Sequence, residues 1–271
     1  MKRDKVDIDE LISVIIPCFN SESFIRDCIN SVLMQNYKNK EIIVIDDGST
    51  DDTLIVLEEF AKTVTILKQG NQGAASARNL GIKHSRGSFI ALLDSDDIWK
   101  PDKLEKQMVT IVETNLDLVY CGGESLGQSG PTRRYVPIFS GNCYQYFIEN
   151  PTKAIVILGC SSALFRKSIL DKSGYFDEDF IGAAEDWDFF RRYSRHGRIG
   201  FSKENLVQYR FHSNNISNRH LVDFYRGNLR AIKKMFDEDY TISIRKRMLI
   251  LIKFGLIVLK SILKKRKFDS H

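Results

Sequence analysis

The sequence has few cysteines, and those it has show no pairing pattern. Five cysteines are scattered through 271 residues without a Cys-x-x-Cys pair, which argues against both a disulfide framework and a zinc knuckle. An apolar stretch is also missing after Met-Lys-Arg, because three acids follow within residues 6–10. We therefore expect no secretory signal, a reducing compartment and a cytoplasmic protein.

Acidic residues are missing from the C-terminal segment. Nine Lys and Arg residues and no acid lie in residues 240–268, which leaves 31 basic against 35 acidic residues, or −4, for the rest of a chain of net charge +5. Because the basic character is confined to the tail, it excludes a nucleic-acid groove spread over the fold. It favours a terminal segment that meets an anionic surface.

No apolar run is long enough to span a bilayer. The longest candidate, Met248 to Leu263, has sixteen residues and is interrupted by Lys253 and Lys260, whereas a spanning helix needs ~20 apolar residues. We expect residues 219–271 to form a basic amphipathic helical tail, lying on the inner face of the cell membrane as a peripheral attachment. A helix packed on the preceding domain, or in a homodimer interface, stays an open alternative.

Short apolar runs alternate with helix-length segments through the first half of the chain. The runs cover residues 11–17, 41–46, 63–68 and 89–94, and the segments between them cover residues 23–35, 51–61 and 74–84. This alternation predicts an α/β fold with a mostly parallel central sheet flanked by helices. Three runs end in polar stretches, "PCFN", "DDGSTDD" and "DSDD", and ligands of such sheets bind at the carboxyl ends of the strands.

The stretch "ALLDSDDIWKP" places three carboxylates directly after an apolar run. On an extended strand end, Asp94 and Asp96 would point the same way, because side chains alternate with period two. Such a pair suits Mg²⁺ or Mn²⁺, which takes one or two carboxylates and completes its shell with phosphate oxygens and water. The structural alternative is a solvated Asp-rich turn. Downstream of the second run, "NQGAASARNLGI" carries Arg78, which can meet a phosphate or a carboxylate bidentately.

In this order and spacing, the motifs resemble those of the family 2 glycosyltransferases, inverting nucleotide-sugar enzymes of the GT-A fold. The resemblance covers residues 11–218 and rests on "ISVIIPCFN", "DDGS", "NQGAASARNLGI", "DSDD" and "ED". It implies a GT-A catalytic domain over residues 1–218. It also implies transfer of a sugar from a UDP-sugar to a hydroxyl of a glycan or lipid-linked acceptor, in bacterial surface polysaccharide synthesis.

The resemblance also implies roles for individual residues of the donor site. Nucleotide-binding residues would be Pro17, Phe19, Asn20, Asp47, Arg78, Asp94 and Ser95. Among these, Phe19 would stack on uracil where the family usually has Tyr, Asp47 would accept the imide N–H, and Asp94 would contact the ribose. Asp96 would bind the Mn²⁺ or Mg²⁺ at the diphosphate, and His212 of "QYRFHSNNIS" would complete its shell.

The motif "ED" is matched by Glu185 and Asp186. By similarity, Asp186 is the catalytic base that deprotonates the acceptor hydroxyl, with Glu185 and Trp187 on the acceptor side. Paired acids raise one another's pKa, which suits a proton acceptor working near neutrality. The structural alternative is a helix whose first turn carries acids because its N-terminus is positive.

Two other classes of protein compete with this interpretation. "FIALLDSDDIW" also resembles the strand of haloacid-dehalogenase-type phosphatases, in which Asp94 would be the nucleophile, although Asp97 stands where that family has Thr or Val. A non-catalytic sugar-nucleotide-binding module is the second alternative. A Rossmann dehydrogenase is disfavoured, because "PCFN" replaces the glycine-rich turn that binds a pyrophosphate.

Overall fold

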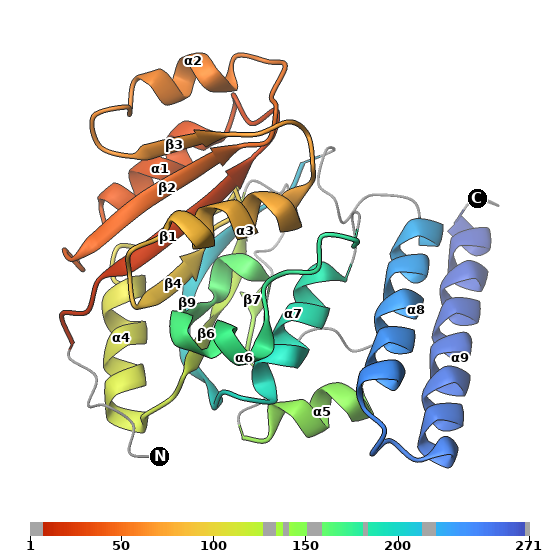
Figure 1. Ribbon diagram of the computed structural model, residues 1–271. Helices are drawn as coiled ribbons and strands as arrows, with labels where there is room; N and C mark the ends of the chain where they lie inside the picture. Colours follow the sequence, from red (N-terminus) through yellow and green to blue (C-terminus); the bar gives the residue numbers. More distant parts are fainter. Residues whose placement is uncertain are drawn as a thin grey trace.

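The computed structural model describes residues 8–126, 134–137, 141–150, 159–180, 184–212 and 221–268. Within them, a mixed nine-stranded sheet runs in the order β3-β2-β1-β4-β8-β6-β9-β5, and β7 pairs with β6 (Figure 1). The strands are β1 (Ile12–Cys18), β2 (Lys40–Asp46), β3 (Thr65–Lys68), β4 (Phe89–Leu92), β5 (Ile98–Trp99), β6 (Leu118–Leu126), β7 (Arg134–Tyr135), β8 (Leu164–Arg166) and β9 (Ile199–Arg210).

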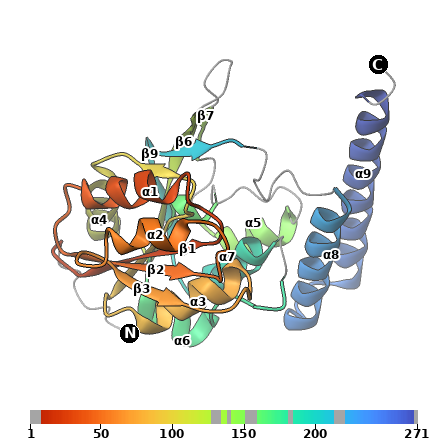
Figure 2. The same cartoon turned by 90° about the horizontal axis from the view of Figure 1, so that it is seen from above.

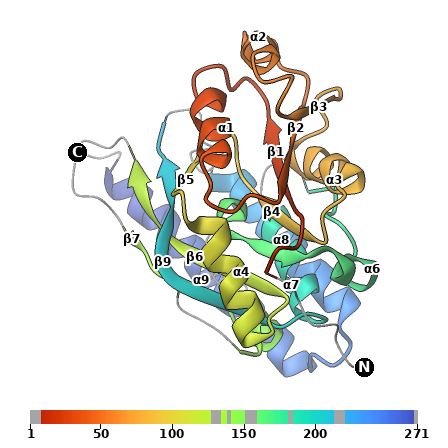
Figure 3. The same cartoon turned by 90° about the vertical axis from the view of Figure 1, so that its left-hand side faces the viewer.

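Helices cover both faces of this sheet, as expected for the α/β class. They are α1 (Ile25–Leu33), α2 (Thr53–Glu58), α3 (Ala74–His84), α4 (Lys103–Thr114), α5 (Cys143–Glu149), α6 (Leu170–Ser173), α7 (Glu185–Ser194), α8 (Leu221–Glu238) and α9 (Ile244–Phe268), with 3₁₀ turns at η1 (Cys160–Ser162) and η2 (Lys167–Ile169). Seen from the side opposite α9, α1 and α4 lie on one face and α3 on the other (Figure 3).

The first half of the sheet is parallel, as the sequence predicts. β1 pairs in parallel with β2 on one side and β4 on the other, and β3 extends the sheet beyond β2. All seven residues of β1 are buried, which is why the strand reads as a continuous apolar run. Pro17 is tolerated in this central strand because the pairing with β4 ends at Ile15 and Leu92, before a missing N–H would matter.

The second half of the sheet is mixed. β8 runs antiparallel to both β4 and β6, whereas β6 and β9 are parallel, with register shifts around Gly122. The prediction of a mostly parallel sheet is therefore confirmed for the first four strands in the chain, whereas the later strands pair in both directions. Short strands such as β8, with three residues, carry too little periodicity to reveal their direction.

The apolar residues form one cluster on each face of the sheet. Ile15 of β1 joins the cluster of α3, α7 and α8, whereas Val14 and Ile16 join the cluster of α1 and α4, because successive strand residues face opposite ways. Helix α3 approaches the sheet closely at Gly81. A Cβ added there would lie 2.6 Å from both Ile15 Cγ2 and Ile45 Cδ1.

Helices α8 and α9 lie side by side at one end of the molecule, with α9 outermost (Figures 1 and 2). Ile232 and Met235 of α8 are buried in the same cluster as α7, and Ile250 and Phe254 of α9 pack against α8. The predicted tail helix thus lies within α9, and it packs on the preceding fold along one side. No described helix is long and apolar enough to cross a membrane. The boundary predicted at residue 218 falls outside the described residues.

Candidate active site

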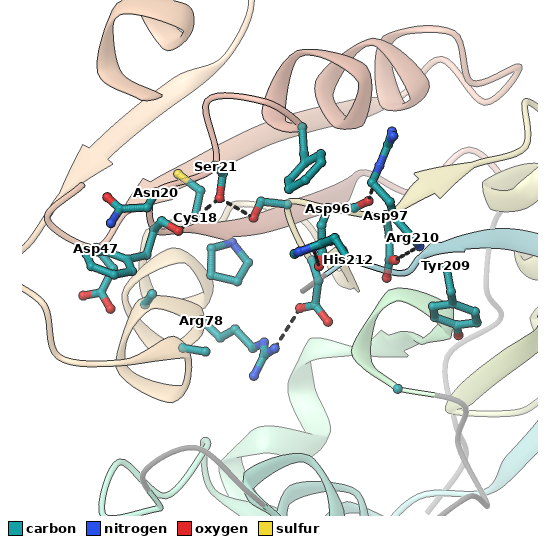
Figure 4. A pocket seen from close by; sticks show the side chains of 18 of the residues that line it. Cys18, Asn20, Ser21, Asp47, Arg78, Asp96, Asp97, Tyr209, Arg210 and His212 are labelled. Carbon is teal, nitrogen blue, oxygen red and sulfur yellow. Dashed lines mark hydrogen bonds and ion pairs between the residues drawn. The ribbon is translucent and has the colours of Figure 1, made fainter. Parts of the chain in front are cut away.

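The ends of β1, β2 and β4 meet at one rim of the sheet, where they border a cavity of about 680 Å³ (Figure 4). Residues that directly follow these three strands line it, together with the end of β9. The convergence follows from the parallel register, since the carboxyl ends of parallel neighbours lie on the same edge. The predicted donor-side residues all line this cavity: Pro17, Phe19, Asn20, Asp47, Arg78, Asp94, Ser95, Asp96 and His212.

The residues after β1 offer an exposed ring on a fixed loop. Phe19 is 43% exposed, so one face of its ring is available to a ligand. Asn20 takes a left-handed conformation with φ of 49°, which Asn tolerates better than most residues. Its Oδ1 accepts from the Thr50 N–H at 2.8 Å, and its own N–H donates to Ser49 Oγ at 3.0 Å. The "PCFN" loop is thereby tied to the loop after β2.

Asp47 is committed to the loop that leads into α3. Its carboxylate accepts from Gln69 Nε2, from the Gln72 N–H and from the Gly73 N–H, each at 2.8 Å. An ionised carboxylate offers about four acceptor positions, so about one remains for a ligand. Asp47 is therefore a structural brace for this wall of the cavity as well as a candidate contact for a base.

The acids of "DSDD" lie on a tight turn, which corrects the expectation of an extended strand end. β4 ends at Leu92, and the Asp97 N–H donates to the Asp94 carbonyl at 3.1 Å. The alternation rule for strands therefore does not apply, and Asp94 and Asp96 face different partners. Ser95 lies between them, with its hydroxyl 2.8 Å from that of Ser21. The turn has the geometry of the structural alternative, yet all of its acids line the cavity.

Arg78 connects the two halves of the site. It is 5% exposed, and its Nη2 lies 2.8 Å from Asp94 Oδ1 while its Nη1 lies 3.5 Å from Glu185 Oε1. Among the described residues its buried Nε has no hydrogen-bond partner. A buried donor without a partner is costly. An oxygen-rich ligand in the cavity would satisfy it.

Asp96 and His212 contact one another in the wall of the cavity. Their Oδ2 and Nε2 atoms lie 3.0 Å apart, and the His212 ring stacks on Phe24 with 4.5 Å between ring centroids. Burial and the neighbouring Asp94 charge raise the pKa of Asp96, whereas the contact with His212 lowers it. Residues 213–217 of the predicted "QYRFHSNNIS" segment lie outside the described residues.

This pair fits a divalent cation. Two ligands at right angles, each ~2.1 Å from an ion, lie ~3 Å apart, as Asp96 Oδ2 and His212 Nε2 do. Among the described residues, no group of three or more His, Cys, Asp or Glu is arranged to hold an ion. Two protein ligands match the coordination preference of Mg²⁺ and Mn²⁺, whose other positions are filled by phosphate oxygens and water. The donor set therefore fits the predicted metal.

Asp97 and Arg210 are site residues that sequence reasoning missed. Asp97 is buried, accepts from Ser161 Oγ at 2.6 Å and accepts from the Arg210 N–H at 3.2 Å. Arg210 Nε in turn donates to the Asp96 carbonyl at 3.2 Å. These contacts fasten the end of β9, two residues before His212, to the acidic turn. The sequence feature that could have revealed Asp97 is that "DSDD" holds three acids, one more than a cation with two protein ligands needs.

The predicted acceptor-side residues stand at the start of α7, next to the cavity rather than in its wall. Asp186 Oδ1 accepts from the Trp187 N–H at 2.7 Å. Burial, and then the charge of Glu185, raise the pKa of Asp186 to about 6. Trp187 is buried against Phe147 at 5.8 Å between ring centroids, so it supports α7 and does not line the cavity.

The sequence pattern of glycosyl transferase family 2 matches residues 13–174. The chain belongs to this family. A relative with 31% identity is TuaG of Bacillus subtilis, described as a putative teichuronic acid biosynthesis glycosyltransferase; the match covers 76% of this chain and 81% of TuaG. WfgD of Escherichia coli, a UDP-Glc:α-D-GlcNAc-diphosphoundecaprenol β-1,3-glucosyltransferase, is 38% identical over 47% of this chain and 51% of its own length.

Solved structures show the same fold. TarS of Staphylococcus aureus, in a complex with UDP-GlcNAc, superposes with a TM-score of 0.70 at 22% identity, over 90% of this chain and 71% of that chain. The GT-A fold predicted for the family 2 chain is thereby confirmed. Family membership favours glycosyl transfer over the phosphatase and dehydrogenase alternatives. Asp94, which would be the nucleophile of a phosphatase, is already paired with Arg78.

Proposed function

We propose that this family 2 glycosyltransferase is an inverting enzyme that moves a sugar from a UDP-sugar to an acceptor hydroxyl. The observation that carries the proposal is the position of Arg78, whose guanidinium joins Asp94 in the donor cavity to Glu185 beside Asp186. A donor bound along the cavity would bring its anomeric carbon toward α7. There, a carboxylate with a pKa raised to about 6 stands ready to accept a proton.

The donor half would hold the nucleotide by stacking and hydrogen bonding. Phe19 offers its exposed ring to uracil, and Asp47 offers its remaining acceptor position to the imide N–H. Arg78 Nε, which has no partner among the described residues, offers a donor to diphosphate or ribose oxygens. Asp96 and His212 would hold a Mn²⁺ or Mg²⁺, which would supply positive charge to offset the negative charge of the leaving diphosphate. An imidazole ligand favours Mn²⁺ of the two.

The acceptor half would supply the base. Asp186 removes the proton of the acceptor hydroxyl as its oxygen attacks the anomeric carbon on the side opposite the leaving UDP, which inverts the configuration. Arg78 pairs with Asp94 at 2.8 Å and lies 3.5 Å from Glu185, whereas Asp186 makes no direct ion pair among the described contacts and so keeps its carboxylate available for a proton. Positioning and electrostatic stabilisation would supply most of the rate enhancement.

The acceptor we propose is a glycan or a lipid-linked sugar of a bacterial surface polysaccharide, used at the inner face of the cell membrane. The names of two relatives support this class: teichuronic acid synthesis for TuaG, and a diphosphoundecaprenol-linked acceptor for WfgD. A UDP-sugar donor is supported by WfgD and by the TarS complex with UDP-GlcNAc.

A screen of radiolabelled UDP-sugars tests the donor assignment without knowledge of the acceptor. We expect Mn²⁺-dependent release of free sugar from one UDP-sugar, because a bound donor leaks slowly to water. Asp96→Asn should weaken UDP binding in the presence of Mn²⁺ by more than ~10-fold in calorimetry, since it removes a charged ligand. UDP binding that is unchanged by Asp96→Asn, or independent of Mn²⁺, would contradict the assignment.

The binding-module alternative is separated from an enzyme by Asp186→Asn. In an enzyme this variant should bind UDP as the parent does and lose transfer to acceptor. A parent protein that binds UDP but releases sugar from no donor, and transfers it to no member of a broad acceptor panel, would favour a module instead.

A further inference from the structure

Helix α9 carries an apolar face that no described part of the chain covers. One side of the helix packs on α8 through Ile250 and Phe254, which are 3% and 7% exposed. The opposite side holds seven large apolar side chains that are 42–77% exposed: Ile244, Met248, Leu249, Leu251, Ile252, Leu256 and Leu259. An exposed apolar face of this extent marks an interaction site on a globular protein.

The helix is held in a fixed orientation, so the apolar face points away from the rest of the molecule. Arg247 donates to the backbone carbonyls of Ile242 and Asp239 at 2.9 and 3.0 Å, which fastens the turn between α8 and α9. Lys246 pairs with Glu149 of α5 at 3.5 Å, and the rings of Tyr225 and Phe254 meet at 5.9 Å. Figures 1 and 2 agree that α9 is the outermost layer.

Charge decides which partner suits this face. The segment from residue 240 to 268 holds nine basic residues and no acid, and Arg245 and Lys253 are exposed among the apolar side chains. A second copy packed through the same face would bring two such cationic segments together, and their mutual repulsion opposes association. An anionic lipid surface satisfies the apolar and the basic residues together.

We propose that the outward face of α9 docks the enzyme flat on an anionic membrane surface. The apolar side chains enter the boundary between headgroups and acyl chains, and the basic residues meet anionic headgroups. The docking does not depend on the transferase activity, although it gives the proposed lipid-linked acceptor a route to the site. Helix α7, which carries Asp186, lies between the nucleotide-binding half and the α8–α9 pair, so the acceptor side is the side nearer the membrane (Figure 1).

Co-sedimentation of the full chain with vesicles tests the proposal. We expect binding to phosphatidylcholine vesicles that contain phosphatidylglycerol, weaker binding to phosphatidylcholine alone, and loss of binding as salt rises. Arg245→Gln with Lys253→Gln should lower the partition coefficient about 25-fold, since each cation near such a surface contributes a factor of about five. Ile252→Ser with Leu256→Ser should lower it by ~100-fold or more, because each side chain loses its burial.

A matched control is Ile55→Ser on α2, at the far end of the molecule from α9. Ile55 is 61% exposed, so its replacement removes a comparable apolar side chain and should leave vesicle binding unchanged. Circular dichroism and UDP calorimetry without vesicles report folding and the donor site separately from docking. Equal binding to both vesicle types, or none, would overturn the proposal. So would a dimer in sedimentation velocity that the Ile252→Ser, Leu256→Ser variant dissociates, because a second copy would then be the occupant.

Discussion

Replacing Asp186 with Asn should stabilise the protein while abolishing transfer. The pKa of this carboxyl is raised from 3.8 to about 6, first by burial and then by the charge of Glu185. A folded state that raises an acid's pKa is destabilised by ionising it. The cost is absent below the unfolded pKa and fully present above the folded one. A rise of this size corresponds to ~3 kcal/mol at neutral and alkaline pH.

Thermal unfolding at two pH values measures the effect. At pH ~8 we expect Asp186→Asn to melt ~6–12 °C above the parent, given ~2–4 °C per kcal/mol for a chain of this size. Near pH ~4 the difference should shrink to a small fraction of this, because the folded parent is then protonated and its unfolded state, with a pKa of 3.8, is about half protonated. The Asn Oδ1 can still accept from the Trp187 N–H, so the comparison isolates the charge.

Asp188, two residues further along α7, is a control for which we expect the opposite change in melting temperature. Arg192, Arg191 and Lys234 surround its buried carboxylate and lower its pKa despite the cost of burial. Asp188→Asn should therefore melt below the parent at pH ~8. If Asp186→Asn is no more stable than the parent at that pH, or is more stable by the same margin at pH ~4, the raised pKa of Asp186 is refuted.

The same pKa sets the pH dependence of catalysis under the proposed function. A base with a pKa of about 6 is ~10% ionised at pH ~5, so kcat/KM should rise about tenfold from there to its plateau. Glu185→Gln removes a neighbouring negative charge, which lowers the pKa of Asp186. The rise in kcat/KM should therefore occur at lower pH in this variant. If the pH at which kcat/KM rises is unchanged in Glu185→Gln, a group other than Asp186 is responsible for the rise.

Three further substitutions test the fold and the donor site. Gly81→Ala should lower the free energy of unfolding in urea by ~1–3 kcal/mol through overpacking against the sheet, whereas Gly70→Ala, where a Cβ meets nothing within 4 Å, should be neutral. Phe19→Ala should weaken UDP binding in calorimetry by ~1–3 kcal/mol, with affinity retained in Phe19→Tyr. Asp47→Asn should cost ~1.5–3 kcal/mol in urea unfolding, because an amide cannot accept from all three N–H donors.

Much of the donor half could be predicted from the sequence. The apolar runs gave the parallel strands β1, β2 and β4 nearly to the residue, and α3 begins and ends where the pattern of residues 74–84 predicts. From parallel strands it follows directly that "PCFN", "DDGS" and "DSDD" meet at one rim, because the rule concerns backbone direction and needs no knowledge of side-chain packing. The roles of the individual residues remain predictions carried by the family resemblance.

Only the tertiary structure decided which residues far apart in the chain contact one another. Asp96 meets His212 across 116 positions, and Arg78 reaches Glu185 across 107. No local period records such pairs, since they depend on how β9 and α7 pack against the first half. The acidic turn escaped prediction because its shape is held by the Asp97 N–H and by β9, not by strand alternation. The basic apolar tail was visible in the sequence, but which face of α9 meets α8 and which stays exposed was fixed by packing alone.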